Sequence, residues 1–317
     1  MLFEHLSRRI SCAATLAGTV LLVAAGPASA TVLGGSSDQG PAMVEAPNGQ
    51  LCAAWSGTDS SHHLNFACGD PNVGNFTTIT TNQFSTLAPA LAVYQNTVWM
   101  AWTGTNNALN IAAVPMNGNP MLEAFGVGNN DASNQAPALA VAPINGVQEL
   151  VMAWTGTDSK HHLNVASSLN VDPPSTWSAT TTLSQLASGG PSLAFWNNNL
   201  YIGWTGTDSH LNFAMAAPSS TQFGAAQFVK VAGGSNMTSS NAPSLTTTAN
   251  LNYGWRGSGN DIFIAFYNNT APPNAVAAVI GNSGVATGFS PALFTFNGQL
   301  WIGWIDGNNN LQAELLP

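Results

Sequence analysis

The sequence predicts an all-β fold built from six copies of one unit. A Trp recurs about every 50 residues between Leu51 and the C-terminus, and each Trp follows a small residue and an apolar stretch. No part of the chain shows a sustained 3.6-residue apolar period, so long amphipathic helices are not expected. Repeats of about 40–50 residues with four short strands each are typical of propeller blades. We therefore expect one six-bladed β-propeller with four-stranded antiparallel blades over residues 31–317.

Each unit opens with a Pro and an apolar run, which we interpret as its first strand. Pro fits the first residue of a strand, because the ladder does not need its missing N–H group. A turn rich in Asn and Gly follows, and these residues tolerate positive φ. The six prolines are Pro41, Pro89, Pro137, Pro191, Pro243 and Pro291.

The second strand carries the Trp and is expected to be buried on both faces. In the fourth unit, alternation places Leu200, Ile202 and Trp204 on one face. Tyr201 and Gly203 lie on the other, and neither face is polar, as in strands buried on both sides. Because Ala or Gly precedes every Trp, a knob on one sheet is expected to meet a hollow in the next. The anchors, expected in the core, are Trp55, Trp102, Trp154, Trp204, Trp255 and Trp304.

The third strand contains a Leu-Asn pair in the first four units, and a weaker fourth strand follows it. Fourth strands are visible at residues 121–125, 180–183 and 227–231. The sixth unit stops after its third strand, whereas residues 31–34 look like a fourth strand without a unit of their own. We therefore expect residues 31–34 to complete the sixth blade and close the ring, which leaves no unpaired strand edge.

The first 30 residues have the pattern of a secretory signal peptide. Arg8 and Arg9 precede an apolar run from Cys12 to Ala25, and a small-residue cleavage site ends at Ala30. The run is short for a membrane span, although an uncleaved anchor is the alternative. We expect export to the extracellular space, cleavage after Ala30, and no membrane insertion of the mature chain.

Removal of this segment leaves an acidic chain with few cations. Of the five Lys and Arg residues, only Lys160, Lys230 and Arg256 remain, against 13 of the 14 Asp and Glu residues, since Glu4 is also removed. Nucleic-acid binding depends on clustered Lys and Arg that neutralise phosphates, so nucleic acid is not an expected partner. The same deficit disfavours anionic membrane surfaces.

Two cysteines follow the predicted cleavage site, and their spacing predicts a disulfide. If Trp55 faces Asn65 across a hairpin centred on Ser60, then Cys52 faces Cys68 in the same register. Opposed residues at a non-hydrogen-bonded position lie about 4.5 Å apart at Cα, which is within disulfide range. An oxidising compartment favours a disulfide over a metal or redox site.

The turns between the second and third strands carry the candidate binding residues. They display Asp, Asn, His and hydroxyl groups, a mixture suited to the hydroxyls of neutral sugars. The alternative is structural, because Asp and Asn in such turns accept hydrogen bonds from backbone N–H groups two residues on. The candidate ligand-binding residues are Asp59, His62, His63, Asp158, His161, His162, Asp208 and His210.

The histidines of these turns have three interpretations: exposed loop residues, sugar contacts or metal ligands. Adjacent residues on a strand point to opposite faces, so neither His-His pair is well placed to chelate one ion. We assign no metal site and no cofactor.

No catalytic motif is present, so no catalytic residue is assigned. The chain lacks a nucleophile elbow, a zinc-protease helix motif and a phosphate-binding glycine loop. Glycoside hydrolysis would need two carboxylates, and Glu45 and Glu149 are the least ordinary acids because they lie on or beside inner strands. The other acids outside the repeat are Glu123, Asp131, Asp261 and Glu314.

Aromatic residues outside the anchors fall into two groups. Those near the turn between the first two strands are expected to line clefts between blades, where a ring can stack on a sugar. They are Tyr94, Trp99, Trp196, Tyr201, Phe296 and Trp301. Phe84, Trp177 and Phe223 are expected to pack at the outside of the blades.

The repeat Ala-Trp-Thr-Gly-Thr-Asp-Ser-x-His-His-Leu-Asn, preceded by Ala-Pro-Ala-Leu-Ala, resembles secreted bacterial β-propeller repeats grouped with sialidase-like and fucose-lectin-like propellers. The resemblance covers about residues 40–315 and specifies the repeat type rather than an activity. Sialidases of related fold hold the substrate carboxylate with three arginines, whereas the mature chain has only Arg256, and its turns lack the Ser-x-Asp-x-Gly-x-Thr-Trp order of the sialidase Asp box. Lectin propellers place similar pockets between repeated blades.

The sequence therefore predicts a secreted, lectin-like propeller that binds glycans or glycoconjugates at several weak, repeated sites. One alternative is a glycoside hydrolase-like propeller with a single central pocket, and the other is a non-catalytic interaction scaffold. An enzyme would concentrate unrepeated carboxylates at one mouth of the ring, whereas a lectin would repeat similar pockets. The sequence does not specify the sugar, the oligomeric state or the biological partner.

Overall fold

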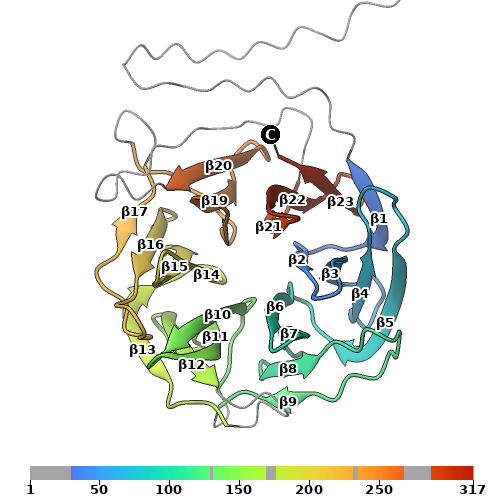
Figure 1. Ribbon diagram of the computed structural model, residues 1–317. Coiled ribbons are helices and arrows are strands. Elements are labelled where there is room, and N and C mark those ends of the chain that lie inside the picture. Colours follow the sequence, from blue (N-terminus) through green and yellow to red (C-terminus); the bar gives the residue numbers. More distant parts are fainter. Residues whose placement is uncertain (1–29, 129–130, 169–175, 231–234, 268–286, 317) are drawn as a thin grey trace, which may run out of the picture.

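Six antiparallel sheets form a closed ring around a central axis (Figure 1). The computed structural model describes residues 30–128, 131–168, 176–230, 235–267 and 287–316. The predicted all-β class and six-bladed propeller are confirmed. The predicted signal peptide lies outside the described residues, apart from Ala30. No helix in the described ranges is long and apolar enough to cross a bilayer.

Each blade runs in chain order from an innermost strand to an outermost strand. Blade 1 contains β2 (Ala42–Glu45), β3 (Leu51–Ser56), β4 (His63–Gly69) and β5 (Thr77–Phe84). Blade 2 contains β6 (Ala90–Tyr94), β7 (Thr97–Thr103), β8 (Leu109–Ala113) and β9 (Phe125–Gly126). Blade 3 contains β10 (Ala138–Ile144), β11 (Val147–Thr155), β12 (His162–Ser168) and β13 (Thr181–Leu186).

The remaining blades follow the same plan. Blade 4 contains β14 (Ser192–Trp196), β15 (Asn199–Thr205), β16 (Leu211–Met215) and β17 (Gln227–Phe228). Blade 5 contains β18 (Ser244–Thr247), β19 (Leu251–Arg256) and β20 (Ile262–Tyr267), and residues 268–286 lie outside the described part. Blade 6 contains β21 (Ala292–Phe296), β22 (Gln299–Ile305), β23 (Asn310–Leu315) and β1 (Thr31–Ser36).

The fourth strands differ in length from their predicted ranges. Residues 121–124 are not a strand, and β9 begins only at Phe125. In blade 4 the strand ends at Phe228, and residues 231–234 are outside the described ranges. The outermost strand has a neighbour on one side only, so fewer ladder bonds define its limits.

The first described strand, β1, lies against β23 as the outermost strand of blade 6. Thr31 pairs with Ala313, Val32 with Gln312, and Leu33 is fully buried. The innermost strands of neighbouring blades touch all the way round, and β21 contacts β2 where the two ends of the chain meet (Figure 1).

The hydrophobic core lies between blades rather than within one sheet. Each anchor Trp faces the preceding blade and is at most 4% exposed, which confirms its predicted place in the core. Trp204 packs with Val151 and Ala153 of blade 3, whereas Tyr201, on the opposite face of β15, packs with residues of blade 5.

The knob that meets the small residue is not the Trp ring. A Cβ on Gly203 would lie 2.4 Å from Leu245 Cδ1, and a Cβ on Gly303 would lie 2.4 Å from Met43 Sδ. The hollow in front of each glycine is therefore filled by an aliphatic side chain from the innermost strand of the following blade. The Trp ring points the other way, because successive strand residues alternate between faces.

Most aromatic residues expected to line clefts are instead buried between blades. Tyr94, Trp99, Tyr201, Phe296 and Trp301 are all buried, and only Trp196 is partly exposed. The blades pack closely enough that no cleft remains for a sugar ring at the buried positions.

The predicted disulfide is present within blade 1. Cys52 of β3 faces Cys68 of β4, with Cα atoms 4.1 Å apart, and Trp55 faces Asn65 as expected.

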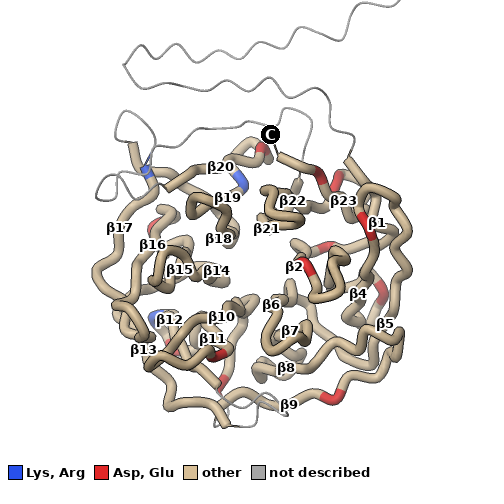
Figure 2. Tube along the Cα trace, in the orientation of Figure 1, with Lys and Arg blue, Asp and Glu red and all other residues tan. Residues whose placement is uncertain are grey.

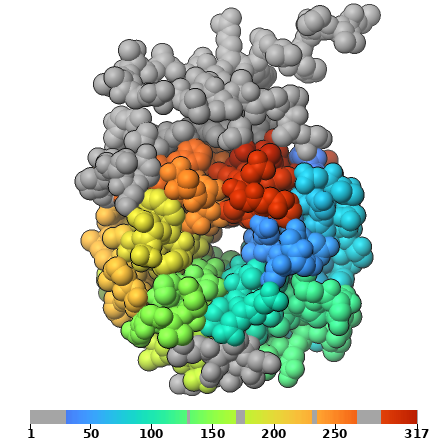
Figure 3. Space-filling model, in the orientation of Figure 1, coloured from blue at the N-terminus to red at the C-terminus, as the bar shows by residue number. Residues whose placement is uncertain are grey.

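A channel runs along the ring axis (Figure 3). Its volume is about 680 Å³, and its wall consists of the six innermost strands and the loops that lead into them. Ala, Leu, Pro, Ser and Thr dominate this wall.

Candidate functional site

The turns between the second and third strands lie at one end of the ring, next to the loops that enter the innermost strands. Short antiparallel bridges join the two: Ser37 to Gly57, Ser133 to Gly156, and Ala187 to Gly206. Each turn is thus anchored to the loop between its own blade and the preceding one.

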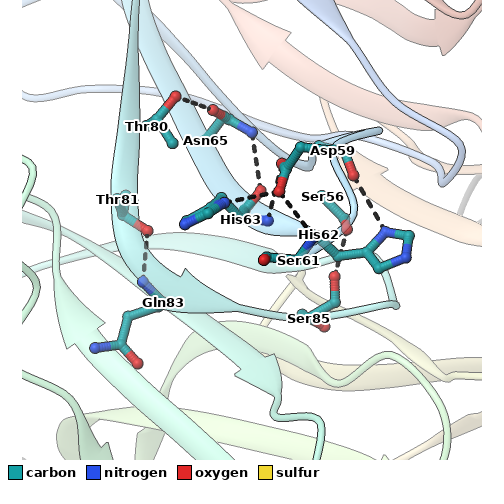
Figure 4. Close-up of polar contacts among 11 residues, drawn as sticks. Ser56, Asp59, Ser61, His62, His63, Asn65, Thr80, Thr81, Gln83 and Ser85 are labelled. Carbon is teal, nitrogen blue, oxygen red and sulfur yellow. Dashed lines mark hydrogen bonds and ion pairs between the residues drawn. The ribbon is translucent and has the colours of Figure 1, made fainter.

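In blade 1, Asp59 organises the whole turn. Its Oδ1 accepts a hydrogen bond of 3.0 Å from the Ser61 N–H, and its Oδ2 accepts one of 3.2 Å from the His63 N–H. The Nδ1 atom of His63 lies 2.8 Å from Oδ1 (Figure 4). The expected bond to the backbone two residues on is therefore present, together with a contact to the imidazole that the turn pattern alone does not predict.

Blades 3 and 4 repeat this arrangement. Asp158 accepts from the N–H groups of Lys160 and His162, and the His162 Nδ1 lies 2.8 Å from its Oδ1. Asp208 accepts from the His210 N–H over 3.1 Å. The His210 Nδ1 lies 2.9 Å from Asp208 Oδ2 but without the alignment of a hydrogen bond.

The pKa of each of these aspartates lies below its ordinary value. Desolvation alone would raise the pKa of Asp59 and Asp158, but hydrogen bonds from the imidazole and backbone N–H groups outweigh it. For Asp208 the His210 side chain is the largest cause of the lowered pKa. These carboxylates are therefore ionised at neutral pH.

The first histidine of each pair has a different role. His62 and His161 lie in the turn with φ of 53° and 59°, and the His62 Nδ1 lies 3.2 Å from the Gly57 carbonyl oxygen. His62 is thus separated from His63 by left-handed turn geometry rather than by strand alternation. Within the described ranges, no three His, Cys, Asp or Glu side chains are grouped to hold a metal ion.

The Gly and Asn of the repeat complete the turn. A Cβ on Gly57 would lie 2.7 Å from Asn65 Nδ2 and 2.8 Å from Asp59 Oδ2, so these side chains fill the space above the glycine. Asn65 donates to the His63 carbonyl oxygen and accepts from the Thr80 hydroxyl (Figure 4). The Gly, Asp and Asn of the motif are therefore required by the turn itself.

The Ser or Thr after each anchor Trp joins neighbouring blades. The Thr103 hydroxyl donates to the Gln135 carbonyl oxygen over 2.7 Å, and the Thr103 carbonyl oxygen accepts from Ser85 Oγ over 2.8 Å. We call this chain of contacts the hydroxyl belt. Its members are Ser37, Ser56, Ser85, Thr103, Ser133, Thr155, Ser188, Thr205 and Ser239. In blade 5, Arg256 Nε donates to the Thr287 carbonyl oxygen over 2.8 Å and continues the belt.

Exposed aromatic rings lie beside two of the aspartate-bound histidines. The Phe84 ring is 40% exposed, with its centroid 4.7 Å from that of His63. The Phe228 ring is 39% exposed and lies 5.2 Å from that of His210. In blade 3 the residue opposite His162 is Leu186. Phe84 was expected to pack at the outside of its blade, and the structure instead gives it an open face.

The unrepeated acids do not converge. Glu45 of β2 lines the channel, where its Oε2 accepts from the Asn297 N–H over 2.9 Å. Glu149 is buried in β11 opposite Ala142 and does not line the channel. Among the described residues that line the channel, Glu45 is the only acid.

Comparisons with known proteins show the fold. No family model and no curated protein matches the sequence. AofleA from Arthrobotrys oligospora superposes with a TM-score of 0.65 at 12% identity, over 92% of this chain and 86% of that one. The fucose-specific lectin from Aleuria aurantia gives 0.60 at 12% identity, over 91% and 94%. The Trypanosoma rangeli sialidase gives 0.56 at 12% identity, over 89% of this chain but 55% of that one.

Proposed function

We propose that the protein binds neutral glycans at the Asp–His turns of the propeller. The observation that carries the proposal is the joint position of the Asp59 carboxylate, the His63 ring that it holds, and the exposed Phe84 ring beside that imidazole. Blade 4 repeats the arrangement around His210 and Phe228.

These groups offer what a sugar requires. An exposed aromatic ring supports the apolar C–H face of a sugar, and a fixed polar atom beside it orients a hydroxyl. Asp59 already accepts from two backbone N–H groups, so it acts as a positioning residue. Its bond to Nδ1 assigns that proton and leaves the His63 Nε2 as an acceptor, with no partner among the described residues.

The charge of the turns favours a neutral ligand. Asp59, Asp158, Asp208 and Asp306 lie in the turns of four blades, and all four have lowered pKa values. Recognition of an acidic sugar relies on Arg or Lys, and Figure 2 shows how few of these the ring carries. Arg256 is engaged by Asn241 and by Thr287.

The structural neighbours support a glycan as the class of ligand. The Aleuria aurantia lectin is fucose-specific and binds α-methyl-L-fucoside. The low identity restricts this support to the general class, and we do not propose fucose in particular.

We also propose that the chain acts outside the cell. Residues 1–30 have the pattern of a signal peptide cleaved after Ala30. The Cys52–Cys68 disulfide supports this proposal, because disulfides persist in oxidising compartments.

Hydrolysis in the central channel has less support. A retaining or inverting glycosidase places two carboxylates on either side of the scissile bond. The described channel wall supplies Glu45 alone, and one of its oxygens already accepts from a backbone N–H group.

A glycan array probed with residues 31–317 tests the proposal. We expect binding to neutral glycans and none to sialylated or sulfated ones. The double substitution Phe84→Ala and Phe228→Ala should lower the signal at least tenfold, whereas Val147→Ala, at an exposed residue in the turn between β10 and β11, should leave it unchanged. Binding that survives the double substitution would contradict the proposed site. Hydrolysis of a model glycoside without binding to the array would favour the hydrolase alternative.

A further inference from the structure

We infer that the protein uses two glycan sites at opposite edges of one face, so that its partner is a surface or polymer bearing many neutral sugar groups. This inference rests on the proposed function and adds the number of sites, their placement and the kind of partner. It follows from which turns carry an exposed ring and where those turns lie in the ring of blades.

Only two of the three Asp–His turns have an aromatic platform. His63 and His210 each lie beside an exposed Phe, whereas His162 lies opposite Leu186. An aromatic ring gives a sugar a flat, polarisable surface that a branched aliphatic side chain does not. Blade 3 therefore holds the same polar groups without the platform, and its affinity for a sugar is expected to be much lower.

The two complete sites belong to blades 1 and 4, which are three blades apart in a ring of six. Figure 1 shows β5 and β17 on opposite sides of the propeller. Phe84 is the last residue of β5 and Phe228 is the last residue of β17, so both rings lie on outermost strands.

The spacing of strands sets a minimum separation of the two sites. Three steps of about 4.8 Å separate an innermost from an outermost strand, so each site lies about 14 Å outside the channel wall. With the channel between them, the two rings are at least about 30 Å apart. A short oligosaccharide does not reach from one to the other, and two separate glycan chains are needed to fill both.

Both sites also face the same way. His63 and His210 begin or precede the third strand of their blades, at the end of the ring where the second-to-third turns meet the loops from the preceding blade. A planar array of glycans can therefore contact both sites together. Two weak sites that bind one array gain affinity through effective concentration, by about 10²-fold or more when the spacing fits.

A titration and a surface measurement test this inference. The probes are the methyl glycosides of L-fucose, D-galactose, D-mannose and N-acetyl-D-glucosamine, and albumin carrying each sugar at high or low density. For the sugar that binds, we expect two sites per chain by calorimetry. We also expect dissociation from dense albumin to be at least tenfold slower than from sparse albumin.

Three variants sharpen the test. Phe84→Ala and Phe228→Ala should each leave one site and abolish the dependence on density. Leu186→Phe should add the missing platform beside His162 and raise the number of sites to three. Val147→Ala should keep two sites and the full density effect.

The outcomes separate the inference from the proposed function. Binding with one site or with six, or a density effect that persists in either single variant, would overturn the inference and leave glycan binding intact. An unchanged site number in both Leu186→Phe and the alanine variants would also overturn it. If none of the four sugars binds, the proposed function and the inference fall together.

Discussion

The hydroxyl of Ser133 donates a hydrogen bond of 2.8 Å to the carbonyl oxygen of Thr155. Ser133 lies in the loop entering blade 3, and Thr155 follows the anchor Trp154, so this bond fixes the loop to the second strand of its own blade. The Thr155 hydroxyl then donates to the Gly189 carbonyl oxygen at the entrance to blade 4. The Thr of the repeated Trp-Thr-Gly motif is therefore a connector between blades, which removes it from the set of ligand-binding residues.

Ser133→Ala should destabilise the fold measurably. Ser133 is fully buried, and its Oγ also accepts from the Gln135 N–H over 3.0 Å, so alanine leaves a buried donor and a buried acceptor unpaired. Loss of such a partner costs about 1–3 kcal/mol. Urea unfolding monitored by tryptophan fluorescence measures the change, with Ser60→Ala at an exposed turn position as the control. Equal unfolding midpoints for the two variants would show that the belt contributes little.

Gly203→Ala should destabilise through overpacking. The new Cβ would lie 2.4 Å from Leu245 Cδ1 and 2.8 Å from Tyr253 Cε2, both in buried side chains of blade 5. Overpacking of this kind costs about 1–3 kcal/mol. Adding Leu245→Ala should recover part of the loss, because it vacates the space that the methyl group needs. A double variant less stable than the sum of the single variants would contradict this account.

The fold could be predicted from the sequence because six copies of one pattern report the same environment. A Trp with a small neighbour on the opposite face specifies a strand buried on both sides, wherever the copy occurs. The register of β3 and β4 followed from a single hairpin, and the structure confirms it at Cys52 and Cys68. The direction of the knob was wrong because the pattern of one strand does not say which neighbouring side chain fills the hollow.

The candidate site was only partly predictable, because its aromatic rings come from different positions of the repeat. Phe84 pairs with His63 after a register shift in β4 and β5. Phe228 pairs with Asn212 instead, and its ring reaches His210 from the neighbouring register position. Aligning the six copies therefore does not bring the two rings together, and only the three-dimensional packing does.

Removal of the disulfide should destabilise blade 1 without changing the fold. Cys52 and Cys68 are 16 residues apart, and a loop of that length corresponds to about 3 kcal/mol in the chain-entropy description. The double substitution Cys52→Ala and Cys68→Ala should lower the urea midpoint and keep the far-UV circular dichroism spectrum. Reduction of the native protein should have a similar effect, and reductant should leave the variant unaffected. A native protein insensitive to reductant would argue against a stabilising role.

The turn aspartates should make stability depend on pH in acid. The pKa of Asp59 is lower in the folded protein than its ordinary value of 3.8, so the folded state binds its proton less readily than the unfolded chain. The ionised carboxylate therefore stabilises the fold fully above about pH 3.8, and this contribution is lost as the pH falls through the folded-state pKa. Asp59→Asn should melt below the native protein at pH 7, and the difference should shrink below about pH 3. Melting curves from pH 7 to pH 2 measure it, and a difference that grows in acid would contradict the sign.

Deletion of β1 should open the ring at blade 6. Residues 31–36 pair with β23, bury Leu33, and place Gly35 against the ring of Trp55, where a Cβ would lie 2.2 Å from an indole carbon. Thr31 Oγ1 also donates to the Pro71 carbonyl oxygen over 2.8 Å, which ties β1 to blade 1. Loss of the Leu33 burial alone costs about 2 kcal/mol. The exposed edge of β23 is in addition a template for pairing with a second chain. Residues 37–317 should therefore melt at a lower temperature than residues 31–317 and should associate at high concentration in analytical ultracentrifugation. If both chains melt together as monomers, β1 is not what closes the propeller, and the contacts of β21 with β2 are sufficient to hold the ring shut.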